Sequence, residues 1–208
     1  MILLPFRCID SSVNEQEVAY PWMNTVFLAL SSIVTLAVLA TNYFVFLLVE
    51  LLFVPIGWLV HVNLYHMVGN LFLMLVLGNF VNRKMGSLGY FLFVVLCGIG
   101  GALFHALIED TGVVGASAIV FGLMGYLVVV AGKVRFDCTY WIVLFWGVKR
   151  LQCRVVVGVL LFGQVVFQIL QPENLISLPA HIFGLLFGVV IGFFTTRREA
   201  IRALEPPN

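Results

Sequence analysis

A serine and a histidine in otherwise apolar segments of this chain have the chemistry of an acyl-transfer site. A serine hydroxyl becomes a nucleophile when a base accepts its proton, and imidazole is suited to that task near neutral pH. N–H donors then stabilise the oxyanion that forms when the serine attacks a carbonyl carbon. We expect Ser117 to be the nucleophile and His181 the base. The expected oxyanion donors are Asn70, His66 and the backbone amide of Ser117, which is unpaired if it lies in the first turn of a helix.

The spacing of the histidines separates one of them from these donors. His66 and Asn70 are four residues apart, so they share one face of a helix. His61 precedes His66 by five residues, which rotates it away from that face and closer to the water. No acidic residue lies at depth on these helices, so we expect a Ser–His dyad without a third member. The remaining histidine, His105, shares a face with glycines and is interpreted as a packing or hydrogen-bonding residue.

Small residues on two expected helices indicate that these helices pack closely. Gly184 and Gly188 follow His181 on its own helix face. Phe121 and Gly125 follow Ser117 on its own face, with Gly122 beside them. Because small residues at such spacing let two backbones approach, we expect the two helices to pack with the serine and the histidine facing each other.

The composition places these groups in a membrane. Hydrophobic residues make up 62% of the 208 residues and charged residues only 10%, whereas soluble domains are about half apolar and about 25% charged. This excludes a soluble enzyme, a disordered segment, a coiled coil and a disulfide-rich secreted module. The 11 Lys and Arg against 10 Asp and Glu leave a net charge of +1, which predicts no nucleic-acid partner. The expected fold class is therefore an all-α membrane protein in contact with the lipid bilayer.

Apolar stretches between charges predict six transmembrane helices in one membrane domain, residues 23–196. Residues 1–22 are expected to form a short cytoplasmic N-terminal segment, and residues 197–208 a short cytoplasmic tail. Residues 136–148 are apolar but too short to span, so we interpret them as a re-entrant or interfacial stretch. The expected spans are 23–49, 63–81, 88–108, 113–131, 155–170 and 176–196.

The basic residues orient the expected helices. All 11 Lys and Arg fall in loops on one side of the six spans, and the opposite loops carry only acidic charges. By the positive-inside rule the basic side is cytoplasmic, together with both termini. At about 1.5 Å per residue, Ser117 and His181 lie roughly 6 and 8 Å below the outer surface. By the same measure Asn70 lies roughly 10 Å deep and His66 roughly 4 Å, so one shallow layer holds all four side chains.

Three motifs, in this order along the chain, resemble those of the rhomboid intramembrane serine proteases. His61, His66 and Asn70 have a similar H-x4-H-x3-N spacing. Residues 115–125, GASAIVFGLMG, resemble the family's G-x-S-x stretch, and residues 180–188, AHIFGLLFG, resemble its A-H-x-x-G-x-x-x-G. The resemblance implies the fold of the compact bacterial members, a six-transmembrane-helix rhomboid-like bundle with both termini cytoplasmic.

The resemblance also implies roles for the site residues. Ser117 would be the nucleophile and His181 the base and acid of an enzyme in the bacterial inner membrane. That enzyme would cut the transmembrane segments of protein substrates near their outer ends, without a metal or a cofactor. Gly115 would permit a tight turn into the helix of Ser117, and Phe121 would pack against the His181 ring.

The sequence departs from the family's pattern at a few positions. Ala118 stands where relatives often have glycine after the serine. Asn82 and Lys84 replace the Glu and Arg of a common E-x-R-x-G-S segment. These departures bear on rate and loop architecture more than on chemistry, because the proposed dyad and oxyanion donors are all present.

Two other interpretations stay open. Any one of the polar residues could form only a helix–helix hydrogen bond, as Ser, His and Asn do in many membrane bundles. A catalytically silent rhomboid-like protein that binds transmembrane helices would share the fold without needing the dyad. A solute transporter is disfavoured because the spans carry no buried charge and no paired broken helices. A metalloprotease lacks its His-Glu-x-x-His motif, and an aspartyl protease lacks an Asp within a span.

Overall fold

A computed structural model describes residues 2–9, 22–40, 54–61, 63–110, 112–142, 145–170 and 177–202 of the chain. Contacts divide the chain into two compact units. The site unit comprises Ala19–Gly125 and Ser177–Gly188. The sheet unit comprises Met1–Val18, Tyr126–Ile176 and Val189–Asn208. All the candidate site residues belong to the site unit.

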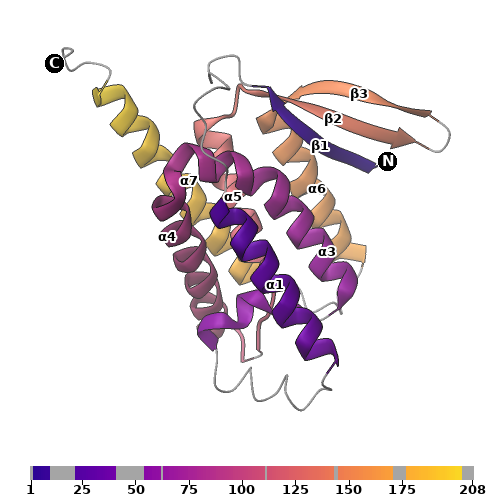
Figure 1. The fold of residues 1–208 in the computed structure, drawn as a ribbon, viewed down its shortest axis with the longest axis vertical. Coiled ribbons are helices and arrows are strands. Elements are labelled where there is room, and N and C mark those ends of the chain that lie inside the picture. The colour runs from indigo at the N-terminus through magenta and orange to yellow at the C-terminus, as the bar shows by residue number, and fades with distance from the viewer. Residues whose placement is uncertain are drawn as a thin grey trace. The chain divides into compact units, whose positions relative to one another are not determined.

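The described part of the site unit is helical (Figure 1). Two of its helices, α5 (Ser117–Val130) and α7 (Leu178–Arg202), begin in the site unit and end in the sheet unit. The others are α1 (Trp22–Ala40), the 3₁₀ helix η2 (Val54–Leu59), α3 (Leu64–Leu73), the π-helical η3 (Met74–Gly78) and α4 (Asn79–Ala106).

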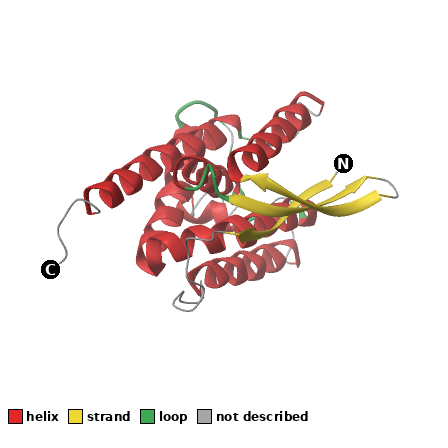
Figure 2. Cartoon of the chain, turned by 90° about the horizontal axis from the view of Figure 1, so that it is seen from above, coloured by secondary structure: helices red, strands yellow, loops and turns green. Residues whose placement is uncertain are grey.

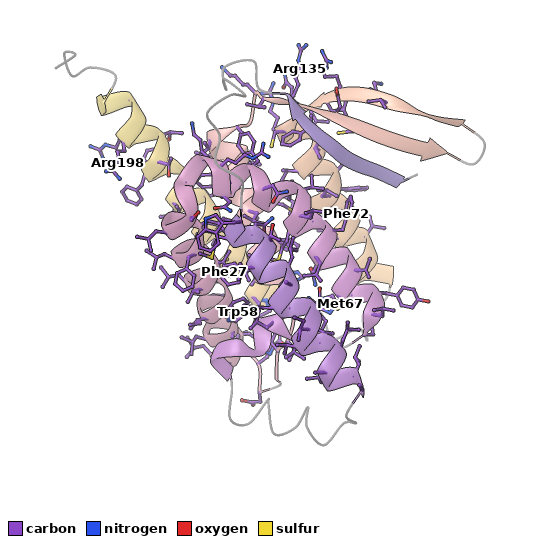
Figure 3. All side chains as sticks on the ribbon, in the orientation of Figure 1. Phe27, Trp58, Met67, Phe72, Arg135 and Arg198 are labelled. Carbon is purple, nitrogen blue, oxygen red and sulfur yellow. The ribbon has the colours of Figure 1, made fainter. Side chains whose placement is uncertain are left out.

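One face of α1 packs into the site unit. Its buried residues recur every three or four positions, as expected for one face of an α-helix. Among them, Phe27 packs edge-on against Trp58 of η2 with ring centroids 5.7 Å apart (Figure 3). Trp58 in turn leaves no room for a side chain at Gly98, where a Cβ would lie 2.7 Å from the indole ring. The buried residues of α1 are Asn24, Phe27, Ser31, Thr35 and Val38.

The chain folds back on itself inside α4. Gly86 has φ 75° and ψ 166°. This backbone conformation lies outside the helical region, and glycine adopts it at little cost. In a straight helix Gly78 and Tyr90, twelve positions apart, would be separated by about 18 Å. Instead, a Cβ at Gly78 would lie 2.5 Å from the Tyr90 hydroxyl. Residues 64–85 and 87–106 are therefore two helical segments side by side, close to the second and third expected spans.

A buried asparagine ties α1 to both of these segments. Asn24 Nδ2 donates to the carbonyl oxygen of Met74 at 3.0 Å and to Oδ1 of Asn79 at 2.7 Å. The Tyr90 hydroxyl donates to Oδ1 of Asn24 at 2.6 Å. Asn24 and Tyr90 are both fully buried. Because water cannot reach them, this network supplies the hydrogen bonds that their polar groups would otherwise lack.

Three helical regions of the described chain are long and apolar enough to cross a membrane: Trp22–Ala40, Leu64–Ala106 and Leu178–Arg198. Two shorter apolar helices, Ser117–Val130 and Cys153–Val166, accompany them. The six-span count and the cytoplasmic placement of both termini stay predictions. Residues 41–49 of the first expected span and residue 176 of the last lie outside the described residues.

The sheet unit corrects the expectation of an all-α fold. It contains an antiparallel sheet of order β1-β2-β3, formed by β1 (Ile2–Ile9), β2 (Arg135–Ile142) and β3 (Phe145–Gln152), followed by α6 (Cys153–Leu170) (Figure 2). Residues 136–148, which we interpreted as a re-entrant or interfacial stretch, lie largely in the β2–β3 hairpin, and their position relative to the membrane stays a prediction. The expected N-terminal segment likewise contains a strand.

The local sequence of β2 explains this outcome. The strand is rich in aromatic and β-branched residues, which favour extended backbone. Phe136 and Cys138 are buried while Arg135 and Asp137 are less so, which is the alternation of a half-buried strand. Across the hairpin, Arg150 Nε donates to Oδ1 of Asp137 at 3.1 Å.

Candidate active site

Ser117 is the first residue of α5, rather than lying four residues inside a helix that begins at residue 113. The turn before it depends on Gly115, which has a φ of 113°, a value that favours glycine. A Cβ at Gly115 would also lie 2.7 Å from Cε1 of His66. Because Ser117 lies in the first helical turn, its backbone amide has no partner within the helix. This satisfies the condition under which that amide can serve as an oxyanion donor.

His61 holds the residue that precedes Ser117. The amide of Ala116 donates to Nε2 of His61 at 3.4 Å, and Nδ1 of His61 lies 3.2 Å from Oγ1 of Thr35. The Thr35 hydroxyl donates its own proton to the carbonyl oxygen of Leu59 at 3.1 Å. Nδ1 of His61 must therefore be the donor to Thr35, and Nε2 the acceptor. His61 is 1% exposed, so the expectation that it lies closer to the water is wrong.

His66 and Asn70 lie on α3, the helix that Asn63 caps. The cap is a hydrogen bond from the His66 amide to Oδ1 of Asn63 at 2.8 Å. The His66 ring is 5.2 Å from the His61 ring and touches Gly115. Among the described residues, Nδ1 of His66 and Nδ2 of Asn70 are buried without a hydrogen-bond partner. Such groups are rare and costly in folded proteins, so these two retain hydrogen-bonding capacity for a further partner.

His181 lies one turn inside α7 and stacks on the helix of Ser117. The rings of His181 and Phe121 are 4.1 Å apart between centroids and 11° from parallel. Phe121 is one helical turn after Ser117, and His181 is 4% exposed. The stacking fixes the plane of the imidazole next to the turn of α5 that begins with the serine.

Glycines bring α5 and α7 into backbone contact. A Cβ at Gly184 would collide with the carbonyl oxygen of Ala118, the residue after Ser117. A Cβ at Gly122 would lie 3.3 Å from the carbonyl oxygen of Gly184. Close approach of this kind is what small residues permit between membrane helices. Gly188, one turn further along α7, is also buried.

A sequence model of the rhomboid domain matches residues 52–198, well over half of the chain. The chain belongs to the rhomboid family. A comparison with curated proteins finds none that matches it. The matched range contains every candidate residue of the site, and with its apolar helices this rhomboid is an integral membrane protein.

In this rhomboid the methyl group of Ala118 occupies a defined place. Ala118 is 4% exposed, and a Cβ at Gly101 of α4 would lie 2.6 Å from that methyl. Cys97 Sγ, one turn earlier on α4, donates to the carbonyl oxygen of Ala118 at 3.1 Å. The alanine that departs from the family's pattern is thus accommodated by a glycine on the facing helix.

The described residues contain no hydrogen bond between the Ser117 hydroxyl and the His181 ring, although both are well within the described chain. Such bonds are often long in enzymes without substrate and shorten in the complex. The same described residues include no group of three or more His, Cys, Asp or Glu that could hold a metal ion. The chemistry proposed below therefore uses the serine and imidazole groups.

Sequence reasoning missed Thr35, which orients His61 from α1. A signal was present, because Ser31 and Thr35 are four residues apart and so share one face of an apolar helix. Both hydroxyls donate to the carbonyl oxygen of Leu59, at 2.9 and 3.1 Å. Their hydrogen-bond partners are distant in sequence. The pattern therefore identifies a polar face of the helix but does not predict which residue that face contacts.

Proposed function

We propose that this rhomboid is an intramembrane serine endopeptidase that hydrolyses a peptide bond near the outer end of a substrate's transmembrane helix. The observation that carries the proposal is the packing of α7 on α5. It stacks the His181 ring on Phe121 and brings Gly184 against Ala118, so the two helix starts that bear the serine and the histidine are neighbours.

The reaction needs only groups that this site supplies. His181 accepts the proton of the Ser117 hydroxyl as the oxygen bonds to the carbonyl carbon of the substrate. The peptide C–N bond then breaks, and the leaving amine takes the proton from His181. Water repeats the sequence on the acyl-enzyme ester, which releases the carboxylic acid and restores Ser117.

The proposed oxyanion donors are three groups near the start of α5 and on α3, and the first two have no partner in the part of the chain that the structure describes. The Ser117 amide begins α5 and so has no partner within the helix, and Nδ2 of Asn70 is buried without a partner. His66 supplies a third N–H from its ring. Donors held in place before the reaction stabilise the developing charge without reorganisation, which is the largest contribution of such sites to rate.

The proposal extends to the location of the enzyme. Every Lys and Arg lies on one side of the expected spans. Both termini are therefore cytoplasmic, and the site opens toward the outer leaflet of a bacterial inner membrane. A substrate helix must unwind there to present a peptide bond, so segments with helix-weakening residues are the preferred substrates.

Covalent labelling with a fluorophosphonate tests the nucleophile. We expect the purified protein to be labelled and Ser117→Ala to remain unlabelled, while Ser32→Ala, whose hydroxyl bonds only within α1, is labelled like the parent. Labelling that persists in Ser117→Ala would refute the assignment. An unlabelled parent that also leaves model transmembrane substrates uncut in liposomes would favour the catalytically silent, helix-binding protein.

A further inference from the structure

A hydrogen-bonded pair outside the dyad joins the end of α4 to the start of α7. The Ser177 hydroxyl oxygen and Nδ1 of His105 are 2.7 Å apart, and the two residues are 6% and 3% exposed. We propose that His105 and Ser177 are positioning residues that fix the first turn of α7 and, through it, the His181 ring. The catalytic consequence rests on the proposed function, whereas the pairing and its effect on the ring do not.

Ser177 holds the first turn of α7 through two of its atoms. Its carbonyl oxygen accepts from the His181 amide at 3.2 Å. Its side-chain oxygen accepts from the Ala180 amide at 3.1 Å. A serine at this position satisfies backbone amides that have no partner within the helix. The backbone amide of His181 is therefore hydrogen-bonded directly to the residue that caps its helix.

The proton of the Ser177 hydroxyl completes the arrangement. Because the hydroxyl oxygen accepts from Ala180, its proton is available for donation. Nδ1 of His105 lies within reach, at the distance of a good hydrogen bond. The tautomer of His105 decides which of the two atoms donates, and the hydroxyl can take either role while it accepts from Ala180. A cap whose hydroxyl is itself held from a neighbouring helix loses rotational freedom, so it fixes the turn more firmly than a cap facing solvent.

The position of His105 on α4 makes it a suitable anchor. One turn earlier, Gly101 lies against both helices of the site, and a Cβ there would be 2.6 Å from Cβ of Ala118 and 3.7 Å from Cβ of Ala180. Ala180 directly precedes His181. The same face of α4 thus sets the approach of α5 and α7, and His105 adds the polar contact that fixes where α7 begins.

With Glu109 this cluster has the composition of a Ser–His–Glu triad, but its geometry differs from that of a catalytic triad. Its carboxylate lies 3.8 Å from Nδ1 of His105, the same atom that faces Ser177. In a catalytic triad the carboxylate instead orients the ring from the side opposite the serine. The Ser177 oxygen is buried and is engaged as a helix cap. A positioning role is the one that uses all of these contacts.

Four variants distinguish loss of the His105–Ser177 hydrogen bond from its retention. His105→Leu and Ser177→Ala remove it, whereas His105→Asn keeps a hydrogen-bonding group near the place of Nδ1 and Ser177→Thr keeps the hydroxyl. With a transmembrane substrate in liposomes, we expect the first two to lower kcat by about 10- to 100-fold with little change in KM, because misplacement of a catalytic group has effects of that size. The second two should recover most of the loss.

Matched controls exclude a general effect on folding. Ala106→Leu places the same new side chain on the neighbouring, exposed position of α4 and should leave kcat unchanged. All variants are compared well below their unfolding temperatures. If His105→Leu and Ser177→Ala keep the parental kcat, or if the retaining variants lose as much as the removing ones, the positioning role is wrong.

Nitrogen NMR of 15N-histidine-labelled protein tests the inference apart from activity. In a Ser117→Ala background, which has no nucleophile, we expect Ser177→Ala to shift the resonances of both His105 and His181. If the parent enzyme neither labels nor cuts a substrate and these shifts still occur, the proposed function fails and the positioning inference stands. An unshifted His181 signal would overturn the inference even if the enzyme is active.

Discussion

His61 and His66 stand 5.2 Å apart beside the turn that leads to Ser117, yet their hydrogen bonding differs completely. Both ring nitrogens of His61 have partners, Thr35 on one side and the Ala116 amide on the other. Within the described chain Nδ1 of His66 has none, and neither has Nδ2 of Asn70, one turn further along α3. We call His61, Thr35 and Ala116 the scaffold half of the site, because hydrogen bonds satisfy their polar groups. His66 and Asn70 form the unsatisfied half, whose buried polar groups lack a partner among the described residues.

The difference separates residues that shape the site from residues that meet a ligand. A buried polar group without a partner lowers stability, so it persists where function needs it. A fully bonded histidine gains nothing by binding substrate, because it would first have to give up an existing bond. Variants on the satisfied side should therefore lower stability, and variants on the unsatisfied side should lower activity.

His181→Ala should have the largest effect on activity. Without a base the Ser117 hydroxyl keeps its proton, so turnover should fall by at least about 1000-fold, the scale found when a member of a serine–histidine pair is removed. Turnover of a transmembrane substrate in liposomes measures it. The exposed neighbour Ile182→Ala should stay near the parental rate. A His181→Ala protein with near-parental turnover would show that the dyad is wrong.

Asn70→Ala should lower kcat by about 10- to 1000-fold, the range for loss of one oxyanion donor. Because Nδ2 of Asn70 has no partner among the residues that the structure describes, its removal breaks no hydrogen bond there, and the free energy of unfolding should hardly change. Kinetics in liposomes and unfolding in detergent measure the two effects. Val68→Ala, an exposed position on the same helix, is the control. A large loss of stability with full activity would show that Asn70 stabilises the fold and is not an oxyanion donor.

His61→Leu should reverse that pattern. It leaves the Ala116 amide without its acceptor and removes the donor to Thr35. The free energy of unfolding should therefore fall by about 1–3 kcal/mol, the cost of leaving a buried polar group unsatisfied. The matched variant is His66→Leu, which should cost less stability because Nδ1 of His66 is already unpaired. If both variants lowered the free energy of unfolding equally, the two histidines would not differ in their contribution to stability.

The sequence predicted the faces on which α5 and α7 pack better than it predicted where α5 begins. Helical periodicity alone placed Gly184 on the face of His181 and Phe121 on the face of Ser117, and these residues lie at the contact of α5 and α7. The start of α5 was less predictable. Gly115 turns the chain with a positive φ and α5 begins at Ser117, and hydropathy carries no information on that angle.

Long-range polar partners and the sheet escaped prediction for different reasons. The bond between Thr35 and His61 joins residues 26 positions apart, and no local pattern specifies such a pair. Residues 136–148 form a short apolar run, which hydropathy cannot distinguish from an interfacial segment. The alternation of buried Phe136 and Cys138 with Arg135 and Asp137 carried the strand signal, but pairing with β1, far away in the sequence, is what the structure adds.

A smaller effect is expected from Thr35, whose hydroxyl is the partner of His61 on α1. Thr35→Val removes the acceptor for Nδ1 of His61, while the carbonyl oxygen of Leu59 keeps a donor from Ser31. The variant therefore leaves one unpaired buried donor, which should cost about 1 kcal/mol of unfolding free energy. Thr35→Ser keeps the hydroxyl and should be closer to the parent.

Ser31→Ala is the matched counterpart of that variant. It takes one of two donors from the Leu59 carbonyl and leaves His61 untouched, so it should cost less than Thr35→Val. Unfolding of the three variants in the same detergent measures the order. If Ser31→Ala costs as much as Thr35→Val, the hydroxyls act through Leu59 alone. The His61 ring would then be held by Ala116 rather than by α1, and the scaffold half would begin at the turn to Ser117.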